Sequence, residues 1–378
     1  MSVVFDAVSY RDEVREWLDR NGDDAPRRTV LEPQDDAAVE RRRAWQRRLA
    51  DGGYVGVTWP RQFGGRGGLP AQRVVIEREL DARGIAGPFD FVGLDMIGPT
   101  LLVCATPEQC ERYLRPLLRA DETWCQLLSE PGAGSDLAAV QTRARSQPDG
   151  TWTVDGQKVW TSFARHAAFG ILLARTDPDV PKHKGLTMFA VPMDADGVTV
   201  RPLRQITGDA EFNEVFLDSV RLADAQRIGE VGDGWKVAVT MLRFERLAVG
   251  SGHLATPVEE LAKAVSIARE DRDARVALGR IGSQLLALRY TSERLSEQIA
   301  TGRAPGPEAG LVKISSVLCS LEACRLAVDV VGPDALLGHT WGDQISALPG
   351  VRSAGGTEEI IRNQIGERVL GLPAEPRP

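Results

Sequence analysis

The 378-residue sequence has few of the residues that build metal centres and disulfide frameworks. It contains five cysteines and four histidines, without a CxxC or HExxH spacing, so we expect neither a zinc site nor a disulfide scaffold. Acidic residues (53) outnumber basic ones (46), which argues against a nucleic-acid binder that depends on neutralising phosphates. No apolar run approaches the roughly 20 residues of a membrane-spanning helix.

The two ends of the sequence carry no targeting signal that we recognise. The first residues, MSVVFDAVSYRDEVREW, place charges in every turn, unlike a secretory signal, and the last residues, LPAEPRP, contain no lipidation motif. We therefore expect a cytoplasmic protein with reduced thiols and no contact with membranes. The length allows two or three domains.

The first third of the chain has the periodicity of helices. Apolar residues at three-to-four spacing predict helices over 10–20, 37–51, 71–82 and 107–118. Between residues 52 and 69 the chain has seven glycines and a proline, too many for a helix. This break is either a surface connection or part of an active-site wall.

From residue 123 to about 232 the apolar period changes to two, which predicts strands, and beyond 232 it becomes helical again. The predicted strands cover 151–154, 170–175, 186–192, 198–202 and 214–222, and because no helices separate them an antiparallel sheet is expected. The predicted C-terminal helices cover 234–253, 257–269, 272–300, 306–331 and 357–370. We therefore predict an α+β multidomain protein with an N-terminal helical domain (1–123), a middle antiparallel β-domain (124–232) and a C-terminal helical bundle (233–378).

A glycine-containing turn follows the first predicted strand of the middle domain. The segment from Trp124 to Asp136 reads WCQLLSEPGAGSD, with Gly134 and Ser135 near its end. Successive backbone N–H groups in such a turn can form a nest for a pyrophosphate. The alternative interpretation is a tight turn followed by a serine that caps a helix.

A second segment, DGQKVWTS at 155–162, combines an indole with two hydroxyls. Asp155 and Gly156 predict a turn that joins two strands, and the second strand ends in Trp160, Thr161 and Ser162. These side chains could stack on a flat heterocycle and donate hydrogen bonds to it. The alternative is a tryptophan buried in the sheet, with the hydroxyls at its edge.

Five segments occur in an order that resembles the acyl-CoA dehydrogenase family: SEPGAGSD (129–136), DGQKVWTS (155–162), TGDAEFNEVFLDSVRL (207–222), GDGWKVAVTMLRFER (232–246) and GGTEEIIRNQIGERVLGLP (355–373). The resemblance covers nearly the whole chain. It implies a helical domain, a β-domain and a four-helix bundle that bind FAD. It also implies α,β-dehydrogenation of an acyl-CoA thioester to the trans-2-enoyl-CoA in fatty-acid β-oxidation, with electrons passed to an electron-transferring flavoprotein.

The resemblance implies roles for individual residues of these segments. Residues implied to contact the flavin ring are Gln126, Leu128, Ser129, Trp160, Thr161 and Ser162, the last as a donor to flavin N5. Residues implied to contact other parts of FAD are Gly134, Ser135, Thr357 and Glu359. Thr357 and Glu359 open the last predicted helix, whose N-terminus favours anions, although Glu359 is equally explained as a complement to the helix dipole. Residues implied to contact substrate are Ser135, Leu242 and Arg246.

The resemblance offers two positions for the catalytic base. One directly precedes the Gly-Thr of the C-terminal motif and is Gly355 here, so that base is absent. The other lies on the first bundle helix before an arginine, as in isovaleryl and long-chain type members, and is Glu245 here. A carboxylate in an apolar site suits this role because desolvation favours proton uptake. Helical spacing places Glu245 on one face with the apolar residues 238, 241, 242 and 249. The alternative is a salt bridge from Glu245 to Arg243 or Arg246.

Gly355 is implied to contribute its backbone N–H to the thioester carbonyl, and its missing side chain leaves room for branched or bulky acyl groups. Many members carry Arg-x-x-Phe-Gly on the second bundle helix, where it reaches the FAD of a neighbouring subunit. The corresponding stretch, 268–275, lacks Phe-Gly and offers Arg269, Arg272 or Arg275 instead. Homodimers, homotetramers and mixed α2β2 assemblies all remain open. Three further alternatives also remain open: a role as a partner subunit, an oxidase or monooxygenase activity, and thioesters of a carrier protein as substrates.

Overall fold

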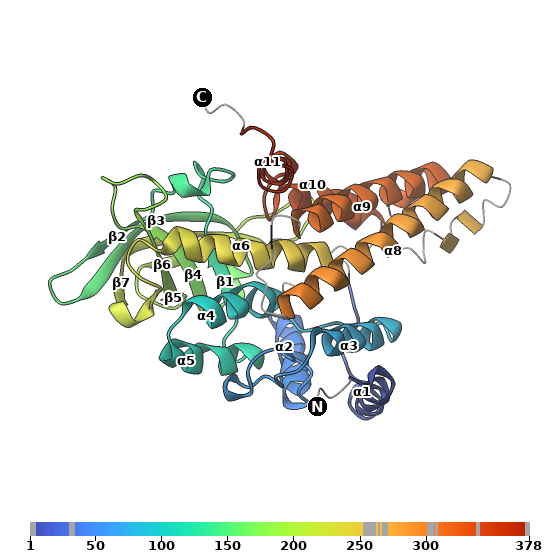
Figure 1. Ribbon diagram of the computed structural model, residues 1–378, viewed down its shortest axis with the longest axis horizontal. Helices are drawn as coiled ribbons and strands as arrows, with labels where there is room; N and C mark the ends of the chain where they lie inside the picture. Colours follow the sequence, from blue (N-terminus) through green and yellow to red (C-terminus); the bar gives the residue numbers. More distant parts are fainter. Residues whose placement is uncertain are drawn as a thin grey trace. The chain divides into compact units, whose positions relative to one another are not determined.

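The computed structural model describes residues 5–29, 35–251, 262–263, 265–266, 271–300, 306, 309–337 and 341–374 (Figure 1). The chain forms two compact units, residues 1–241 (the first unit) and residues 242–378 (the second unit). Helix α6 (Gly234–Ser251) begins in the first and ends in the second. No helix of the described residues is long and apolar enough to cross a membrane.

The N-terminal part of the first unit is helical, as predicted. Its α-helices are α1 (Ala7–Asn21), α2 (Asp36–Asp51), α3 (Pro70–Ala82), α4 (Gly98–Cys104) and α5 (Pro107–Leu118). The side chains of Asp6, Asp35 and Thr106 accept backbone N–H bonds at the starts of α1, α2 and α5. Helix α4 was not predicted, because its glycine and proline stand at its start, where proline is tolerated, and read as a break in the sequence.

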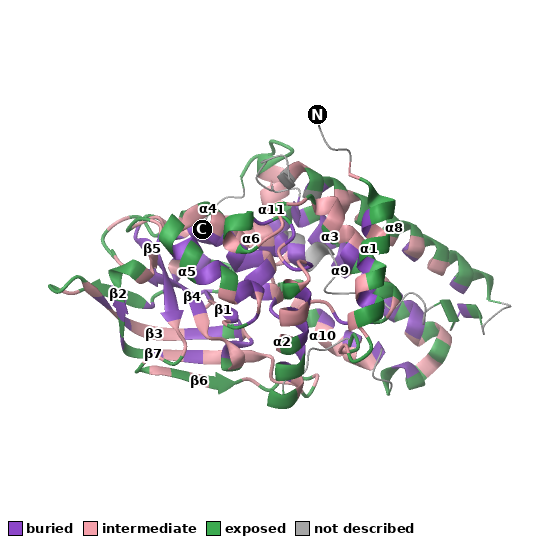
Figure 2. Ribbon diagram, turned by 90° about the horizontal axis from the view of Figure 1, so that it is seen from below, coloured by how far each residue is buried: buried purple, intermediate pink, exposed green. Residues whose placement is uncertain are grey.

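Eight strands form one sheet in the first unit: β1 (Trp124–Leu127), β2 (Arg143–Ser146), β3 (Thr151–Ser162), β4 (Phe169–Arg175), β5 (Leu186–Pro192), β6 (Val198–Pro202), β7 (Phe212–Ala223) and β8 (Arg227–Ile228). The order is β6-β7-β3-β2-β4-β5-β8, with β1 paired to β4. The sheet is antiparallel as predicted, except that β1 and β2 run parallel to β4. Strands β4 and β5 are almost wholly buried (Figure 2), which explains why they read as continuous apolar runs.

The turn predicted at Asp155 and Gly156 is wrong, because both residues lie inside the continuous strand β3. A Cβ on Gly156 would lie 2.3 Å from Thr142 Oγ1 and 2.7 Å from Thr142 Cα. The glycine is therefore needed for the close approach of a neighbouring backbone, which is a recognised reason for glycine within a strand. The same dipeptide is a strong turn signal in the sequence alone.

The described elements of the second unit, besides the end of α6, are the α-helices α8 (Arg272–Ala300), α9 (Ala309–Val331), α10 (Trp341–Ser353) and α11 (Glu358–Arg368) and a 3₁₀ helix at Gly332–Leu336. Helix α10 was not predicted, because it contains Gly342, Pro349 and Gly350. It forms nevertheless, since Trp341 and Leu348 are buried in an apolar cluster with α8 and α9. Most of the helix predicted over 257–269 lies outside the described residues.

Candidate functional site

Trp160 lies in a bulge near the end of β3. Lys158 pairs with Val215 and Thr161 pairs with Asn213, so β3 has one extra residue between these pairs. Trp160 has a left-handed backbone (φ 60°), and its side chain is 62% exposed. Bulges re-aim side chains and are frequent beside active sites. The interpretation of Trp160 as a buried sheet residue is therefore wrong, and its indole is accessible to a ligand.

The two hydroxyl residues after Trp160 differ in environment. Thr161 is buried, and its Oγ1 has no hydrogen-bond partner among the described residues, whereas Ser162 is only partly buried. The amide of Asn213 donates to the carbonyl of Thr161 (3.0 Å), which holds this end of β3 against β7. Of the two hydroxyls, that of Ser162 is the more accessible.

The end of β1 lies beside this part of β3. The backbone N–H of Val159 donates to the carbonyl of Ser129 (2.9 Å). Gln126 and Ser129 are partly buried, Leu128 is buried, and Gln126 Nε2 lies 3.6 Å from Met96 Sδ. The structure therefore brings together the two segments that the sequence assigned to a flavin ring.

A buried ion pair fixes this arrangement. The Lys158 ammonium is completely buried and donates to the carbonyl of Leu128 (2.9 Å) and to Glu130 Oε1 (2.8 Å). Glu130 also accepts the backbone N–H groups of Gln141 (2.6 Å) and Thr142 (2.8 Å). Burial lowers the pKa of Lys158 to about 8, although the Glu130 carboxylate acts in the opposite direction. Sequence reasoning missed both residues, because the strand also contains Asp155 and Gln157 and gives no sign that Lys158 is the buried one.

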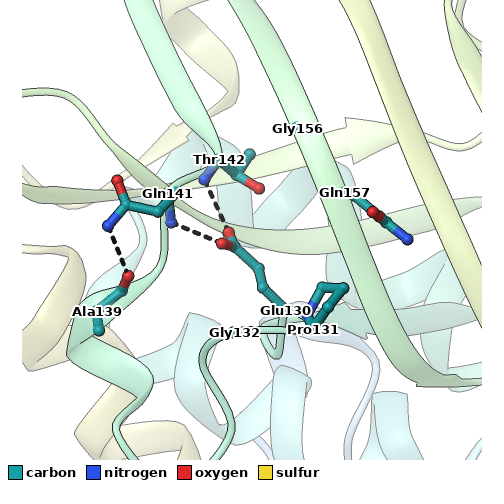
Figure 3. A pocket seen from close by; sticks show the side chains of 8 residues that line it. All are labelled: Glu130, Pro131, Gly132, Ala139, Gln141, Thr142, Gly156 and Gln157. Carbon is teal, nitrogen blue, oxygen red and sulfur yellow. Dashed lines mark hydrogen bonds between the residues drawn. The ribbon is translucent and has the colours of Figure 1, made fainter.

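A cavity of about 510 Å³ adjoins this ion pair (Figure 3). It is lined by residues 130–132, Ala139, Gln141, Thr142, Gly156 and Gln157. Glu130 reaches across it to the backbone of residues 141 and 142, as Figure 3 shows. Neither Gly134 nor Ser135, the residues assigned to a pyrophosphate or to CoA, lines this cavity.

Gly134 and Ser135 lie on an exposed turn. Glu130 and Ala133 exchange backbone hydrogen bonds (3.0 and 3.1 Å), which confirms a tight turn here. The short 3₁₀ turn at Leu137–Ala139 starts after Asp136 without a side-chain cap, so Ser135 does not cap a helix. Its exposed hydroxyl is available to a ligand.

In the second unit, Glu245 is a buried acid on α6, with 9% of its surface exposed. On the same helical face Ala238 and Met241 are completely buried and Leu242 is partly buried. The side chain of residue 249, also predicted on this face, lies outside the described ones. The predicted apolar surroundings of Glu245 therefore hold for the neighbours that the structure describes, and Glu245 does not face open water.

Gly355 and Arg246 lie next to Glu245. A Cβ on Gly355 would be 3.6 Å from Glu245 Oε1, and the backbone of Gly355 is left-handed (φ 65°). Arg246 is also 9% exposed, and its Nε donates to the carbonyl of Gly355 (3.4 Å). Burial lowers the pKa of Arg246, while the Glu245 carboxylate opposes this shift. The structure thus joins the candidate acid, the glycine and a cation, although Glu245 and Gly355 are far apart in the sequence.

Thr357 and Glu359 mark the start of α11. Thr357 is the N-cap, and its Oγ1 accepts the N–H of Ile360 (3.4 Å). Glu359 is exposed, and hydrogen bonds in this first helical turn, mainly from its own backbone, lower its pKa. The helix-dipole explanation of Glu359 therefore agrees with the structure. A role in cofactor binding stays a prediction for both residues.

The residues at the ends of β1 and β3 fit a flavin. An accessible indole, an accessible hydroxyl and a partly buried amide suit a flat ring with polar edges. By contrast, the described residues contain no group of three or more His, Cys, Asp or Glu that could hold a metal ion.

The chain is similar to known proteins over most of its length. Residues 6–121, 125–220 and 232–370 match the family profiles "Acyl-CoA dehydrogenase, N-terminal domain", "middle domain" and "C-terminal domain", respectively. "Acyl-CoA dehydrogenase IpdE1" of Mycobacterium tuberculosis is 39% identical over 98% of this chain and 99% of its own length.

The chain is also similar to a second curated relative and to a solved structure. "Acyl-CoA dehydrogenase FadE34" of the same organism is 41% identical over 86% of this chain, and the match spans 45% of that relative's own length. A solved structure described as "Tcur3481-Tcur3483 steroid ACAD" is 28% identical, with a TM-score of 0.83 over 99% of this chain and 100% of that one.

Proposed function

The chain belongs to the acyl-CoA dehydrogenase family of oxidoreductases, and we propose that it converts an acyl-CoA thioester to the trans-2-enoyl-CoA with FAD as cofactor and Glu245 as base. The observation that carries this proposal is the buried Glu245 carboxylate facing the Cβ position of Gly355. A carboxylate is rarely buried without a reason, and a catalytic base that is kept from water has one.

In the proposed reaction Glu245 takes the proton from the α-carbon of the acyl group. Bound FAD would supply the acceptor for the hydrogen that leaves the β-carbon as hydride. The backbone N–H of Gly355 donates to the thioester oxygen and stabilises the negative charge that develops there. The ring would be held by Trp160, Gln126, Leu128 and Ser129, and the hydroxyl of Ser162 would donate to it.

Other residues would bind the remaining parts of FAD and the substrate. FAD outside the ring would be contacted by Gly134, Ser135, Thr357 and Glu359, and the ring itself also by Thr161. Ser135, Leu242 and Arg246 contact the substrate. Arg246 would do so while its Nε stays on the carbonyl of Gly355.

We propose a bulky, ring-containing acyl group as the substrate class. Two observations support this: Gly355 has no side chain beside Glu245, and the similar solved structure is described as a steroid ACAD. That description also names two components, which supports assembly with a different, related subunit. Light scattering on the chain alone and after co-expression with a related subunit would test this. An electron-transferring flavoprotein is the proposed electron acceptor.

The test compares flavin reduction in the wild-type protein and in Glu245→Gln. Purified protein is mixed anaerobically with straight-chain, branched and polycyclic acyl-CoAs, and the loss of flavin absorbance is followed. We expect the wild type to be reduced fastest by the polycyclic thioester. We expect Glu245→Gln to lose roughly a thousandfold or more in rate, because proton removal by a positioned base contributes about 10²–10⁴-fold.

Glu297→Gln is the matched control, since Glu297 is an exposed acid on α8. It should leave the rate unchanged. Rapid reduction of the Glu245→Gln protein would remove Glu245 from the mechanism. Fastest reduction by a straight-chain thioester would contradict the substrate class but leave the reaction type intact.

A further inference from the structure

Lys313 on α9 is a second buried cation near Glu245, and the proposed reaction does not use it. Only 1% of its surface is exposed. Its Nζ donates to the carbonyl of Arg352 (2.8 Å) and to the carbonyl of Gly356 (2.9 Å). One ammonium thus holds two points of the backbone that lie four residues apart.

These two carbonyls enclose the turn that carries Gly355. Arg352 is in the last turn of α10, where helical carbonyls lack partners within the helix, and Gly356 precedes the N-cap of α11. Gly355 and Gly356 both have left-handed backbones (φ 65° and 98°) and no side chains that could fix them. The position of this turn therefore depends on contacts from outside it, of which Lys313 supplies two and Arg246 a third.

The charges around Lys313 act in both directions. Burial lowers the pKa of Lys313, the carboxylates of Glu245 and Glu358 oppose this shift, and the guanidinium groups of Arg246 and Arg352 add to it. The C-terminus of a helix also favours a cation. A neutral side chain would be easier to bury, so the charge at this position calls for a role beyond packing.

We propose that Lys313 is a positioning residue, which holds the Gly355–Gly356 turn in place beside the Glu245 carboxylate. This inference rests on the proposed function. The thioester oxygen would meet the N–H of Gly355 while Glu245 meets the α-carbon, so a shift of the turn changes the distance between these two groups. Misplacing reacting groups by about 1 Å can cost about a hundredfold in rate.

The first measurement does not depend on catalysis. Hydrogen exchange, followed by mass spectrometry of a peptide that covers residues 350–360, is compared in the wild type, Lys313→Gln and Lys313→Arg. Arg325→Gln is the matched control, because Arg325 is an exposed cation on the same helix. We expect exchange in this peptide to rise roughly tenfold in Lys313→Gln, to return towards the wild-type rate in Lys313→Arg, and to stay unchanged in Arg325→Gln.

The second measurement is anaerobic flavin reduction at increasing acyl-CoA concentration, which separates the limiting rate from the apparent substrate affinity. We expect Lys313→Gln to lower the limiting rate roughly ten- to a hundredfold, with affinity and flavin content within about twofold of the wild type. Lys313→Arg should recover most of the rate. Loss of a lysine with a merely structural role would not lower the limiting rate while leaving substrate affinity and flavin content unchanged.

Unchanged exchange in Lys313→Gln, or unchanged limiting rates, would overturn the inference. It would also be overturned if both Lys313 variants failed to fold while Arg325→Gln folded, because Lys313 would then stabilise the whole bundle and not the turn. A wild-type protein whose flavin no acyl-CoA reduces would contradict the proposed function alone. The exchange measurement would still decide the role of Lys313.

Discussion

Lys158 carries a completely buried ammonium in the first unit, and its hydrogen-bond partners belong to the segment after β1. It ties the carbonyl of Leu128 and the carboxylate of Glu130 to β3. Burial would raise the pKa of Glu130, but the charge of Lys158 and the backbone donors of Gln141 and Thr142 outweigh it, so the pKa is lowered. Lys158 and the two backbone donors thus stabilise the charged form of Glu130, and Glu130 in turn stabilises the charged form of Lys158.

Removing one partner of such a pair leaves the other charge buried and unpaired. We expect Lys158→Met to lower the free energy of unfolding of the first unit by about 3–5 kcal/mol. Urea unfolding followed by tryptophan fluorescence measures this, since seven of the eight tryptophans lie within residues 1–241.

Lys182→Met is the control for that variant. Lys182 pairs with Asp136 at 2.7 Å, but its side chain is 48% exposed. An exposed pair contributes about 0–1 kcal/mol, so the midpoint should hardly move. Equal losses of unfolding free energy in Lys158→Met and Lys182→Met would show that burial of the Lys158–Glu130 pair does not determine the loss.

At the scale of one element, β3 shows why the accessible tryptophan could not be predicted from the sequence. Strand β3 has one extra residue near Trp160. Strand β7 has one extra residue opposite Gly156, since Val154 pairs with Val220 and Gly156 pairs with Leu217. Each bulge contains a residue with a left-handed backbone, Trp160 or Ser219. The alternating pattern of the sequence gives no sign of either bulge, because both depend on pairing with a distant strand.

The close approach at Gly156 gives the prediction for this element. Gly156→Ala would place a methyl group within 3 Å of the side chain and the Cα of Thr142. Since a backbone atom cannot move aside cheaply, we expect a loss of about 1–3 kcal/mol in the free energy of unfolding. Urea unfolding of the purified variant measures this loss.

Gly132→Ala serves as the control, because its Cβ position is open and its φ is not left-handed. Its stability should stay within about 0.5 kcal/mol of the wild type. If Gly156→Ala were as stable as this control, the glycine would be present for another reason than the approach of Thr142.

The sequence predicted helices and strands correctly wherever the spacing of apolar residues was strongly periodic. The strands at 186–192 and 198–202 have the predicted bounds, and the four N-terminal helices are present within a few residues. Helices α4 and α10 contain or begin with glycine and proline, so their local signals oppose the structure that packing imposes. Such tertiary effects cannot be seen in a window of neighbouring residues.

At the scale of the whole molecule, the candidate site depends on contacts between distant parts of the sequence. Glu245 was found from family resemblance and a helical stripe, and its place beside Gly355 agrees with that interpretation. Lys313 and Asn213 were missed, because each acts through backbone carbonyls of another segment. Residue type and spacing carry no information on such partners, so positioning residues become visible only once the chain is folded.

The proposed cofactor leads to a prediction for the stability of the whole protein. A ligand that binds only the folded state stabilises it by about 2.7 kcal/mol at a hundred times its dissociation constant. We therefore expect FAD, added to protein stripped of flavin, to raise the midpoint of thermal unfolding by roughly 3–5 °C, measured by scanning calorimetry. FMN is the matched control, because it has the same ring but lacks the adenylate half. It should give a smaller shift if the turn at Gly134 and Ser135 or the start of α11 contributes to binding. Equal shifts with both flavins would restrict the site to the ring contacts at the ends of β1 and β3, and no shift with either would contradict flavin binding.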